Sequence, residues 1–137
     1  DATDLELALD EAVAMGATEV LVLGSDGGRL DHLVAGLVLL AADAYRTITV
    51  DAILGETRVA VVRTARTLTG AVGQTLSLLA VHGPAVGVRT TGLEYPLCGE
   101  RLEPGSTRGV SNVFALPTAT VTLEQGTLLA VQPASIT

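Results

Sequence analysis

Residues 20–40 read VLVLGSDGGRLDHLVAGLVLL, and this stretch decides the fold of the first part of the chain. It opens with four apolar residues typical of a short buried strand and breaks at Gly24. A turn rich in Gly and Asp follows, and apolar residues then resume with the spacing of a helix over 30–42. The stretch therefore predicts a strand, a tight turn and a helix in direct succession.

The flanking sequence extends this unit in both directions. Upstream, apolar residues recur on one face of an amphipathic helix, which Thr3 and Glu6 can cap at its start and Gly16 can end. Strands are expected at 19–23 and 47–53. A strand, a helix and a second strand with short connections predict a parallel sheet. Two strands and two helices are too few for a complete doubly wound domain. Either the sequence is a fragment, or the sheet is completed by something outside it.

After Gly55 the pattern changes to short strand-like segments separated by Gly, Pro or Asn. These segments are 57–63, 74–81, 85–91, 109–116, 119–123 and 127–131. No helical spacing recurs, which indicates an antiparallel sandwich or a small barrel. We therefore expect two domains, an α/β part over 1–56 and an all-β part over 57–137.

The charge of the chain is unevenly distributed. Residues 1–56 hold eleven Asp or Glu and two Arg, whereas residues 57–137 hold four Glu and six Arg, for a total of −7. The acidic total argues against a nucleic-acid partner. The first part suits divalent cations and the second a phosphorylated ligand, although ordinary surface charge gives the same counts. Lysine is absent, which excludes the phosphate loop GxxxxGK[ST] and Schiff-base chemistry.

The sequence also predicts the location of the protein. The longest apolar run, residues 33–42, is about half of what a bilayer span needs. No basic segment precedes an apolar one at the N-terminus, so we expect neither a signal peptide nor a membrane partner. Cys98 is the single cysteine, which excludes an internal disulfide and indicates a reducing cytoplasm.

The glycine turn is the first candidate site. A glycine-rich turn that leads into a helix points backbone N–H groups at a phosphate, and Gly24, Gly27 and Gly28 could serve this purpose. Their spacing fits neither the dinucleotide pattern GxGxxG nor the hydrolase elbow GxSxG. An equally good interpretation is a local turn that needs glycine for its geometry.

Carboxylates form the second candidate site. Asp1 and Asp4 lie at a predicted helix start, and Asp31 follows the glycine turn together with Arg29. The carboxyl ends of parallel strands meet at one edge of a sheet, where carboxylates and substrate phosphates can hold Mg²⁺ together. Acidic residues at helix starts can instead merely complement the helix dipole. The combination of three aspartates with an arginine favours a functional site.

Other candidate residues carry less information. His32 and His82 lack the spacing of a zinc site and are expected to be structural, and Cys98 has no Cys–His arrangement. Tyr95 lies in a turn-like stretch, where it could stack on a ligand ring or fill the core of the all-β part. Ser111 and Asn112 could form a capped turn or bind a ligand.

Together these stretches resemble bacterial thiamine pyrophosphokinase (thiamine diphosphokinase). Four segments carry the resemblance, namely DATDLELAL at 1–9, VLGSDGGRLDH at 22–32, TTGLEYPL at 90–97 and GVSNVF at 109–114. The resemblance implies the C-terminal part of a parallel-sheet α/β catalytic domain followed by an antiparallel β-sandwich that binds thiamine. It also implies Mg²⁺-dependent transfer of pyrophosphate from ATP to thiamine, with AMP as the second product.

The resemblance assigns roles to individual residues. Asp4 and Asp31 are expected to bind Mg²⁺ and, with Arg29, to act in catalysis. The nucleotide is expected to contact Asp1, Thr3, Gly24, Gly27 and Gly28. Thiamine is expected to contact Tyr95, Ser111 and Asn112. Family members are homodimers whose active sites combine residues of both subunits.

Two departures from the family limit these expectations. The N-terminal half of the catalytic domain, with an acidic GDxDS-type segment, is missing from these residues, so we expect the chain alone to be inactive or nearly so. Gly36 also stands where the family more often has Asn. The alternatives are a non-catalytic thiamine- or nucleotide-binding regulatory module, and a Rossmann-like nucleotide-binding protein of another type.

Overall fold

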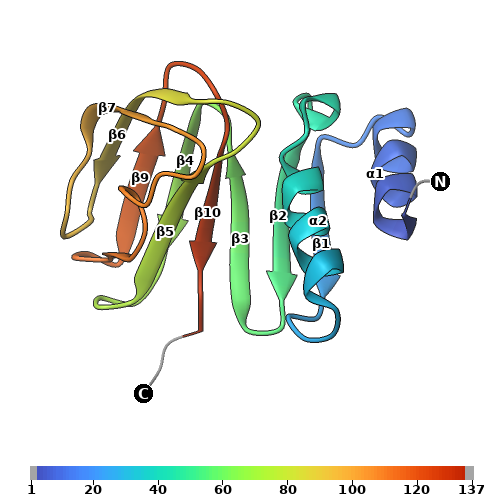
Figure 1. Cartoon of the computed structure of the whole chain (residues 1–137), viewed down its shortest axis with the longest axis horizontal. Coiled ribbons are helices and arrows are strands. Elements are labelled where there is room, and N and C mark those ends of the chain that lie inside the picture. Colours follow the sequence, from blue (N-terminus) through green and yellow to red (C-terminus); the bar gives the residue numbers. More distant parts are fainter. Residues whose placement is uncertain (1–2, 135–137) are drawn as a thin grey trace.

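A computed structural model describes residues 3–134 of the chain, so Asp1 lies outside the described residues. The described part is mostly β-structure with two α-helices at one end (Figure 1). The elements in chain order are α1 (Asp4–Ala14), β1 (Glu19–Gly24), α2 (Leu30–Leu40), the 3-10 turn η1 (Asp43–Tyr45), β2 (Thr49–Leu54), β3 (Thr57–Val62), β4 (Ala65–Thr69), β5 (Thr75–Ala80), β6 (Ala85–Thr91), β7 (Cys98–Leu102), β8 (Asn112–Val113), β9 (Thr118–Thr122) and β10 (Leu128–Gln132).

Helix α1 forms as its sequence predicts. The hydroxyl of Thr3 accepts a hydrogen bond from the backbone N–H of Glu6 at 3.2 Å, which satisfies one of the N–H groups that a helix start leaves open. The helix ends before Gly16, whose φ of +79° is the left-handed conformation that glycine adopts without strain. Leu9 of α1 is buried in a hydrophobic cluster with residues of α2 and the sheet. In the described residues, neither α1 nor α2 is long and apolar enough to cross a membrane.

The predicted parallel pairing is confirmed. Strands β1 and β2 run parallel, with Glu19 opposite Thr49 and Gly24 opposite Leu54. Helix α2 connects them but ends at Leu40, two residues earlier than expected, because the chain turns there into η1. The carboxyl ends of both strands therefore lie at the same edge of the sheet, beside the start of α2.

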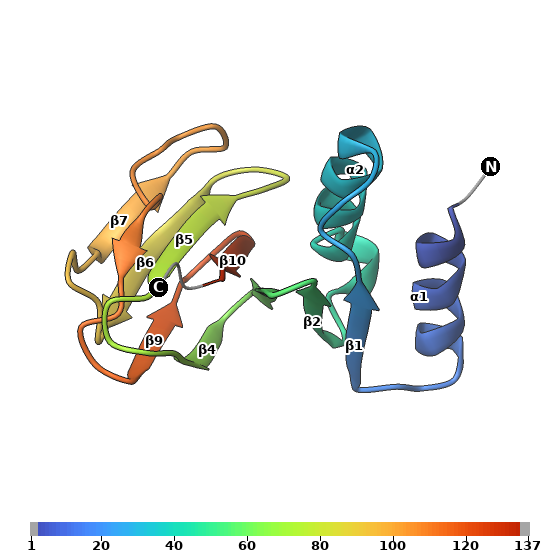
Figure 2. The same ribbon diagram turned by 90° about the horizontal axis from the view of Figure 1, so that it is seen from below.

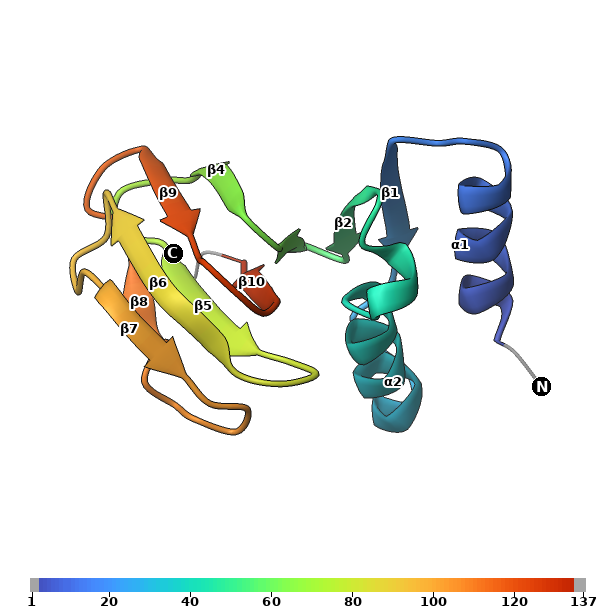
Figure 3. The same cartoon turned by 90° about the horizontal axis from the view of Figure 1, so that it is seen from above.

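A six-stranded sheet continues across residue 56. Its strand order is β1-β2-β3-β10-β5-β8, and β3 pairs with β2 in an antiparallel hairpin whose turn contains Gly55. Strands of both expected domains thus belong to one hydrogen-bonded sheet. Figures 2 and 3 show the helices at the end of this sheet away from β6, β7 and β9.

A second, antiparallel sheet has the order β4-β9-β6-β7. Two of its strands, β4 and β7, were not predicted. Strand β4 buries only Leu68 fully, and β7 reads CGERL with a glycine and two charges, so neither has a strand-like apolar pattern. The expected strand at 109–116 is wrong in length, since the strand within it is only Asn112–Val113, followed by an isolated antiparallel bridge of Phe114 with Leu93.

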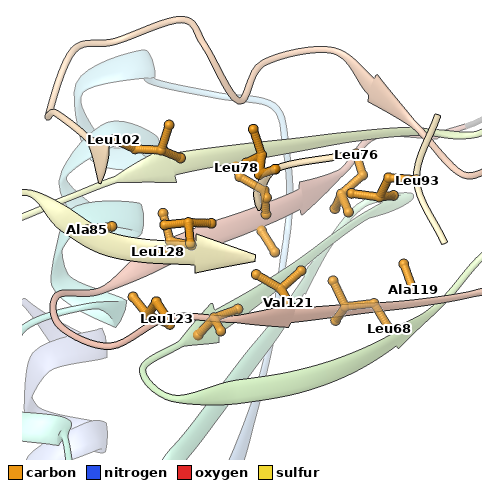
Figure 4. Packing of buried hydrophobic residues seen from close by; sticks show 14 of the residues in the cluster. Leu68, Leu76, Leu78, Ala85, Leu93, Leu102, Ala119, Val121, Leu123 and Leu128 are labelled. Carbon is orange, nitrogen blue, oxygen red and sulfur yellow. The ribbon is translucent and has the colours of Figure 1, made fainter. Parts of the chain in front are cut away.

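Strands β3 and β10 each contribute buried side chains to two hydrophobic cores, one on each face of the sheet. Alternate side chains of a strand point to opposite faces, and here Val59, Val61 and Leu129 face the helices, where they join a cluster with Leu9, Leu40 and Tyr45. The intervening residues Ala60, Val62, Leu128 and Ala130 face the second sheet and join a larger cluster (Figure 4). Its residues on other strands include Leu68, Leu76, Leu78, Val88, Leu102, Phe114 and Val121.

Two side chains of the β-structure donate hydrogen bonds to backbone carbonyls in helix α2 or just after it. The ring Nε2 of His82, in the turn after β5, donates to the carbonyl oxygen of Val38 at 2.7 Å. Arg63, just after β3, donates to the carbonyl oxygen of Ala42 at 2.9 Å. The last carbonyls of a helix have no partner within it, so the His82 contact satisfies such a group of α2. The carbonyl of Ala42 precedes η1 and also accepts from the backbone N–H of Tyr45. His82 thus has a structural contact, as expected.

Candidate functional site

The glycine turn after β1 is held by its own residues. The hydroxyl of Ser25 accepts a hydrogen bond from the backbone N–H of Gly27 at 3.0 Å. Gly28 has a φ of +85°, so a side chain at this position would be strained. Arg29 follows in an extended conformation as the residue that precedes α2. The N–H of Gly27 is therefore already bound. The N–H of His32 in the first turn of α2 is bound too, since it donates to Oδ1 of Asp31 at 3.0 Å, so an anion here would depend on the N–H groups that precede it.

Arg29 and Asp31 form a two-point ion pair at the start of α2. The Nε of Arg29 lies 3.1 Å from Oδ1 of Asp31, and its Nη2 lies 2.6 Å from Oδ2. Both side chains are largely exposed to solvent. The Arg29 guanidinium holds the pKa of the Asp31 carboxyl below its usual value. Exposed ion pairs contribute little to stability, so the pair can open when a ligand competes for either partner.

Two adjoining hollows lie beside α2. One, of about 550 Å³, is lined by Thr3 and Asp4 of α1 and by residues of α2. The other, of about 400 Å³, is lined by Gly24, Gly27 and Arg29 at the glycine turn. Leu5, His32 and Gly36 line both. The structure therefore places Thr3 and Asp4 at a hollow that adjoins the one at the glycine turn.

His32 and Gly36 occupy the shared wall of these hollows. His32 is exposed and borders both, although its spacing gave no indication of a binding role. A Cβ at Gly36 would lie 3.7 Å from the side chain of Leu5, which is ordinary van der Waals contact. Glycine is thus not required there for packing, and the hollow has space for a larger side chain.

The carboxylates do not form a ready-made metal site. Over residues 3–134, no three His, Cys, Asp or Glu side chains are grouped so that they could hold a metal ion. Asp4 lines the larger hollow, whereas Asp31 lines neither and binds Arg29 instead. Proteins usually hold Mg²⁺ through one or two carboxylates, with waters and substrate phosphates as further ligands. The donor set therefore fits Mg²⁺ only together with a bound nucleotide.

Two of the three expected thiamine-contacting residues, Tyr95 and Asn112, contact each other at a different place. The amide of Asn112 is buried, and its Oδ1 accepts from the backbone N–H of Tyr95 at 3.1 Å and from that of Val113 at 2.9 Å. Its Nδ2 donates to the carbonyl oxygen of Tyr95 at 2.7 Å. Asn112 therefore holds both backbone groups of Tyr95, which lies in the connection between β6 and β7.

Tyr95 is 60% exposed, so its ring does not fill the core. Phe114 fills that space and is almost fully buried. Ser111 is exposed and has a φ of +62°, a left-handed conformation that is uncommon for residues other than glycine. Its backbone N–H donates to the hydroxyl of Ser77 at 3.0 Å. An exposed aromatic ring such as that of Tyr95 can stack on a flat ligand.

Close backbone contacts explain two glycines of these segments. A Cβ on Gly92 would overlap the carbonyl oxygen of Thr118, and its φ is +77°. A Cβ on Gly109 would lie 2.6 Å from the carbonyl oxygen of Leu78, whose N–H donates to the carbonyl of Gly109. These glycines shape the segments that carry Tyr95 and Ser111.

The two groups of candidate residues lie apart in one chain. The hollow at the glycine turn and the one beside it are lined by residues of α1, β1, α2 and β2 and by their flanking residues, and Tyr95, Ser111 and Asn112 are not among them. The glycine turn belongs to the helical end, whereas Tyr95 lies between β6 and β7 (Figure 1).

Comparison with known proteins identifies the family of this fold. Residues 60–128 match the family model described as thiamin pyrophosphokinase, vitamin B1 binding domain. A search of the curated proteins finds no sequence relative. Thiamine pyrophosphokinase from Bacillus subtilis has a similar structure, with a TM-score of 0.87 and 24% identity over 99% of this chain and 65% of that one.

Two further structures agree. Thiamin pyrophosphokinase from Geobacillus thermodenitrificans gives a TM-score of 0.81 with 28% identity, over 98% of this chain and 63% of that one. Thiamin pyrophosphokinase from Candida albicans gives 0.68 with 17% identity, over 83% and 44%. The chain spans less than two thirds of the length of each of these proteins. Because the family model covers half of the chain, from β3 to β10, the chain belongs to the thiamine pyrophosphokinase family.

Proposed function

We propose that the chain acts as part of a thiamine pyrophosphokinase, which transfers pyrophosphate from ATP to the hydroxyethyl oxygen of thiamine and releases AMP. The observation that carries this proposal is the match of residues 60–128 to the vitamin B1 binding domain of this family. Such a transfer needs positioning and neutralisation of charge more than a covalent nucleophile. A site with carboxylates, arginine and no lysine can provide both.

On the nucleotide side, we assign binding of the phosphates to the glycine turn and Arg29. Opening of the pair with Asp31 frees a guanidinium fork that matches a phosphate group. Asp4 and Asp31 would hold Mg²⁺ together with the phosphates, and the ion would neutralise their negative charge. The adjoining hollows beside α2 support this assignment, because they bring Thr3 and Asp4 next to Gly24 and Arg29.

On the thiamine side, we assign stacking on an aromatic ring of the substrate to Tyr95. Its ring is exposed, and its backbone is fixed by Asn112. In this assignment Asn112 positions Tyr95, and the exposed hydroxyl of Ser111 provides a polar contact. Fixing the backbone of the stacking residue reduces the entropy lost when the ligand binds.

The separation of the two groups supports an active site shared between two copies of the chain. In this proposal residues 1–56 are the C-terminal part of an α/β catalytic domain, residues 57–137 are a β-sandwich, and each site uses both from different subunits of a homodimer. The exposed, single Cys98 fits a reducing compartment such as the cytoplasm.

A non-catalytic thiamine-binding module is the second candidate. It is favoured by the position of Asp31, which lines neither hollow beside α2 and pairs with Arg29 instead. Calorimetry with thiamine, in the presence and absence of MgATP, combined with measurement of AMP release, distinguishes the two. We expect thiamine binding with little or no AMP release by the 137-residue chain alone. AMP formation at a normal rate, dependent on ATP, thiamine and Mg²⁺, would contradict the expected inactivity.

A further inference from the structure

A small hollow lined by arginines lies at the opposite end of β2 from the glycine turn. Its volume is about 200 Å³. We call it the arginine hollow, and its polar lining residues are Arg46, Thr47, Thr49, Arg63, Thr64 and Arg66. The rest of its lining is apolar, and no carboxylate among the described residues lines it.

The positive charge of this hollow is only partly balanced. Three of the eight arginines of a chain with a net charge of −7 line it. Arg66 is neutralised by Asp51, whose carboxylate oxygens lie 2.8 and 2.9 Å from its Nη2. Arg46 is mostly exposed and has only a long contact of 3.5 Å with Asp43.

Arg63 has neutral hydrogen-bond acceptors but no acidic partner among the described residues. Its guanidinium donates to the carbonyl oxygen of Ala42 and to the hydroxyl of Thr127, both neutral acceptors. Within the described residues it has no carboxylate within 4.0 Å, and its Nε is buried without a partner. Burial lowers the pKa of Arg63; Asp43 opposes this shift and Arg46 adds to it. A half-buried charge without a counter-charge is costly, so a bound anion would stabilise it.

We infer that the arginine hollow binds a small anion that carries a phosphoryl group. Arginine guanidinium groups match phosphate oxygens with paired hydrogen bonds, and threonine hydroxyls can donate further ones. The volume is below the range of about 300–1,000 Å³ of sites for drug-sized ligands, so it matches phosphate or pyrophosphate better than a whole nucleotide.

This site is separate from the proposed nucleotide site. The arginine hollow includes Thr49 at the start of β2, and the second hollow beside α2 includes Leu54 at its end. Five residue steps along a strand span about 17 Å. The inference therefore does not depend on the proposed function.

The test is a titration of the ¹⁵N-labelled 137-residue chain with inorganic phosphate, without Mg²⁺ and at constant ionic strength. We expect saturable shifts of the backbone amides of Thr47, Thr49 and Thr64, which equivalent sodium chloride does not produce. Arg46→Gln should weaken this binding about tenfold or more, because it removes a charged donor and with it at least one charge-assisted hydrogen bond to the phosphate. Arg63→Gln, if it folds, should weaken it at least as much.

Arg101→Gln is the matched control, since Arg101 is also exposed and also pairs with one carboxylate, that of Glu103. Binding in this variant should equal that of the unmodified chain. Shifts that chloride reproduces, or an equal loss in Arg46→Gln and Arg101→Gln, would overturn the inference. Shifts confined to residues 24–31 would overturn it too, while supporting phosphate binding at the glycine turn. If Arg29→Gln removes the shifts at residues 24–31 but leaves those of Thr47, Thr49 and Thr64, the inference of a separate anion site is supported.

Discussion

Replacement of Asn112 by alanine should loosen the segment that carries Tyr95. The change removes three hydrogen bonds, two to the backbone of Tyr95 and one to that of Val113. Each hydrogen bond contributes about 1 kcal/mol, and a buried group left without a partner costs about 1–3 kcal/mol. Because Tyr95 is at the surface, water can reach part of the vacated space. We therefore expect a loss of about 2–3 kcal/mol in the free energy of unfolding.

Urea denaturation measures this loss, and hydrogen exchange of the Tyr95 amide localises it. The amide should exchange faster in Asn112→Ala, because its acceptor is gone. Thr107→Ala is the control at an exposed position of the preceding loop, and it should change stability by less than about 0.5 kcal/mol. A loss below about 0.5 kcal/mol in Asn112→Ala, with unchanged exchange at Tyr95, would refute the positioning role.

Asn112→Asp separates the contacts of the two amide atoms. The carboxylate keeps an acceptor for the N–H groups of Tyr95 and Val113 but cannot donate to the Tyr95 carbonyl while it is ionised. Protonation restores a donor and removes a buried charge. The deficit of this variant relative to the unmodified chain should therefore be smaller at pH 4 than at pH 7, and an equal deficit at both would argue against the assignment.

Three further changes test other parts of the structure. Burial and the Asp10 carboxylate raise the pKa of Tyr45 to about 12. The folded state therefore favours the neutral phenol, and the stability that this phenol contributes is present below pH 10 and is lost as the pH rises through 12. Tyr45→Phe should lower the free energy of unfolding, measured by urea denaturation at pH 7, by about 1 kcal/mol. It should also remove the decrease in stability between pH 10 and 12 that ionisation of Tyr45 causes. Gly92→Ala should destabilise the chain by about 3 kcal/mol or more, because a left-handed φ and a clash with the Thr118 carbonyl combine, and a thermal melt like that of the unmodified chain would contradict this. Arg29→Gln should raise the pKa of the Asp31 carboxyl toward its usual value in an NMR titration, and an unchanged pKa would show that Arg29 does not hold it.

Local patterns predicted the first part of the fold well. The cap at Thr3, the left-handed Gly16 and the apolar strand of β1 depend on neighbouring residues, and each appears in the structure. The alternation of Leu76, Leu78 and Ala80 in β5 likewise reports one buried face. Strands β4 and β7 were missed because each is short and buries little, so pairing with β9 and β6 determines them.

Contacts between distant residues were not predictable in this way. Strand β3 reads as a continuous apolar run because both of its faces are buried, so periodicity could not show that it joins two cores. Residues two apart do not face each other on a helix, yet Arg29 binds Asp31 because it precedes α2 in an extended conformation. The hydrogen bonds between the Asn112 side chain and the Tyr95 backbone join two distant segments, and in the sequence only the family resemblance connects these segments.

Thiamine binding tests the central claim most directly. Calorimetric titration of the 137-residue chain with thiamine should give saturable binding, which Tyr95→Ala weakens and Met15→Ala leaves unchanged. Met15 is also an exposed apolar residue, 76% exposed, but it follows α1 at the helical end of the chain. A folded chain that shows no saturable binding at thiamine concentrations up to about 1 mM, or that binds equally well after Tyr95→Ala, would contradict the account.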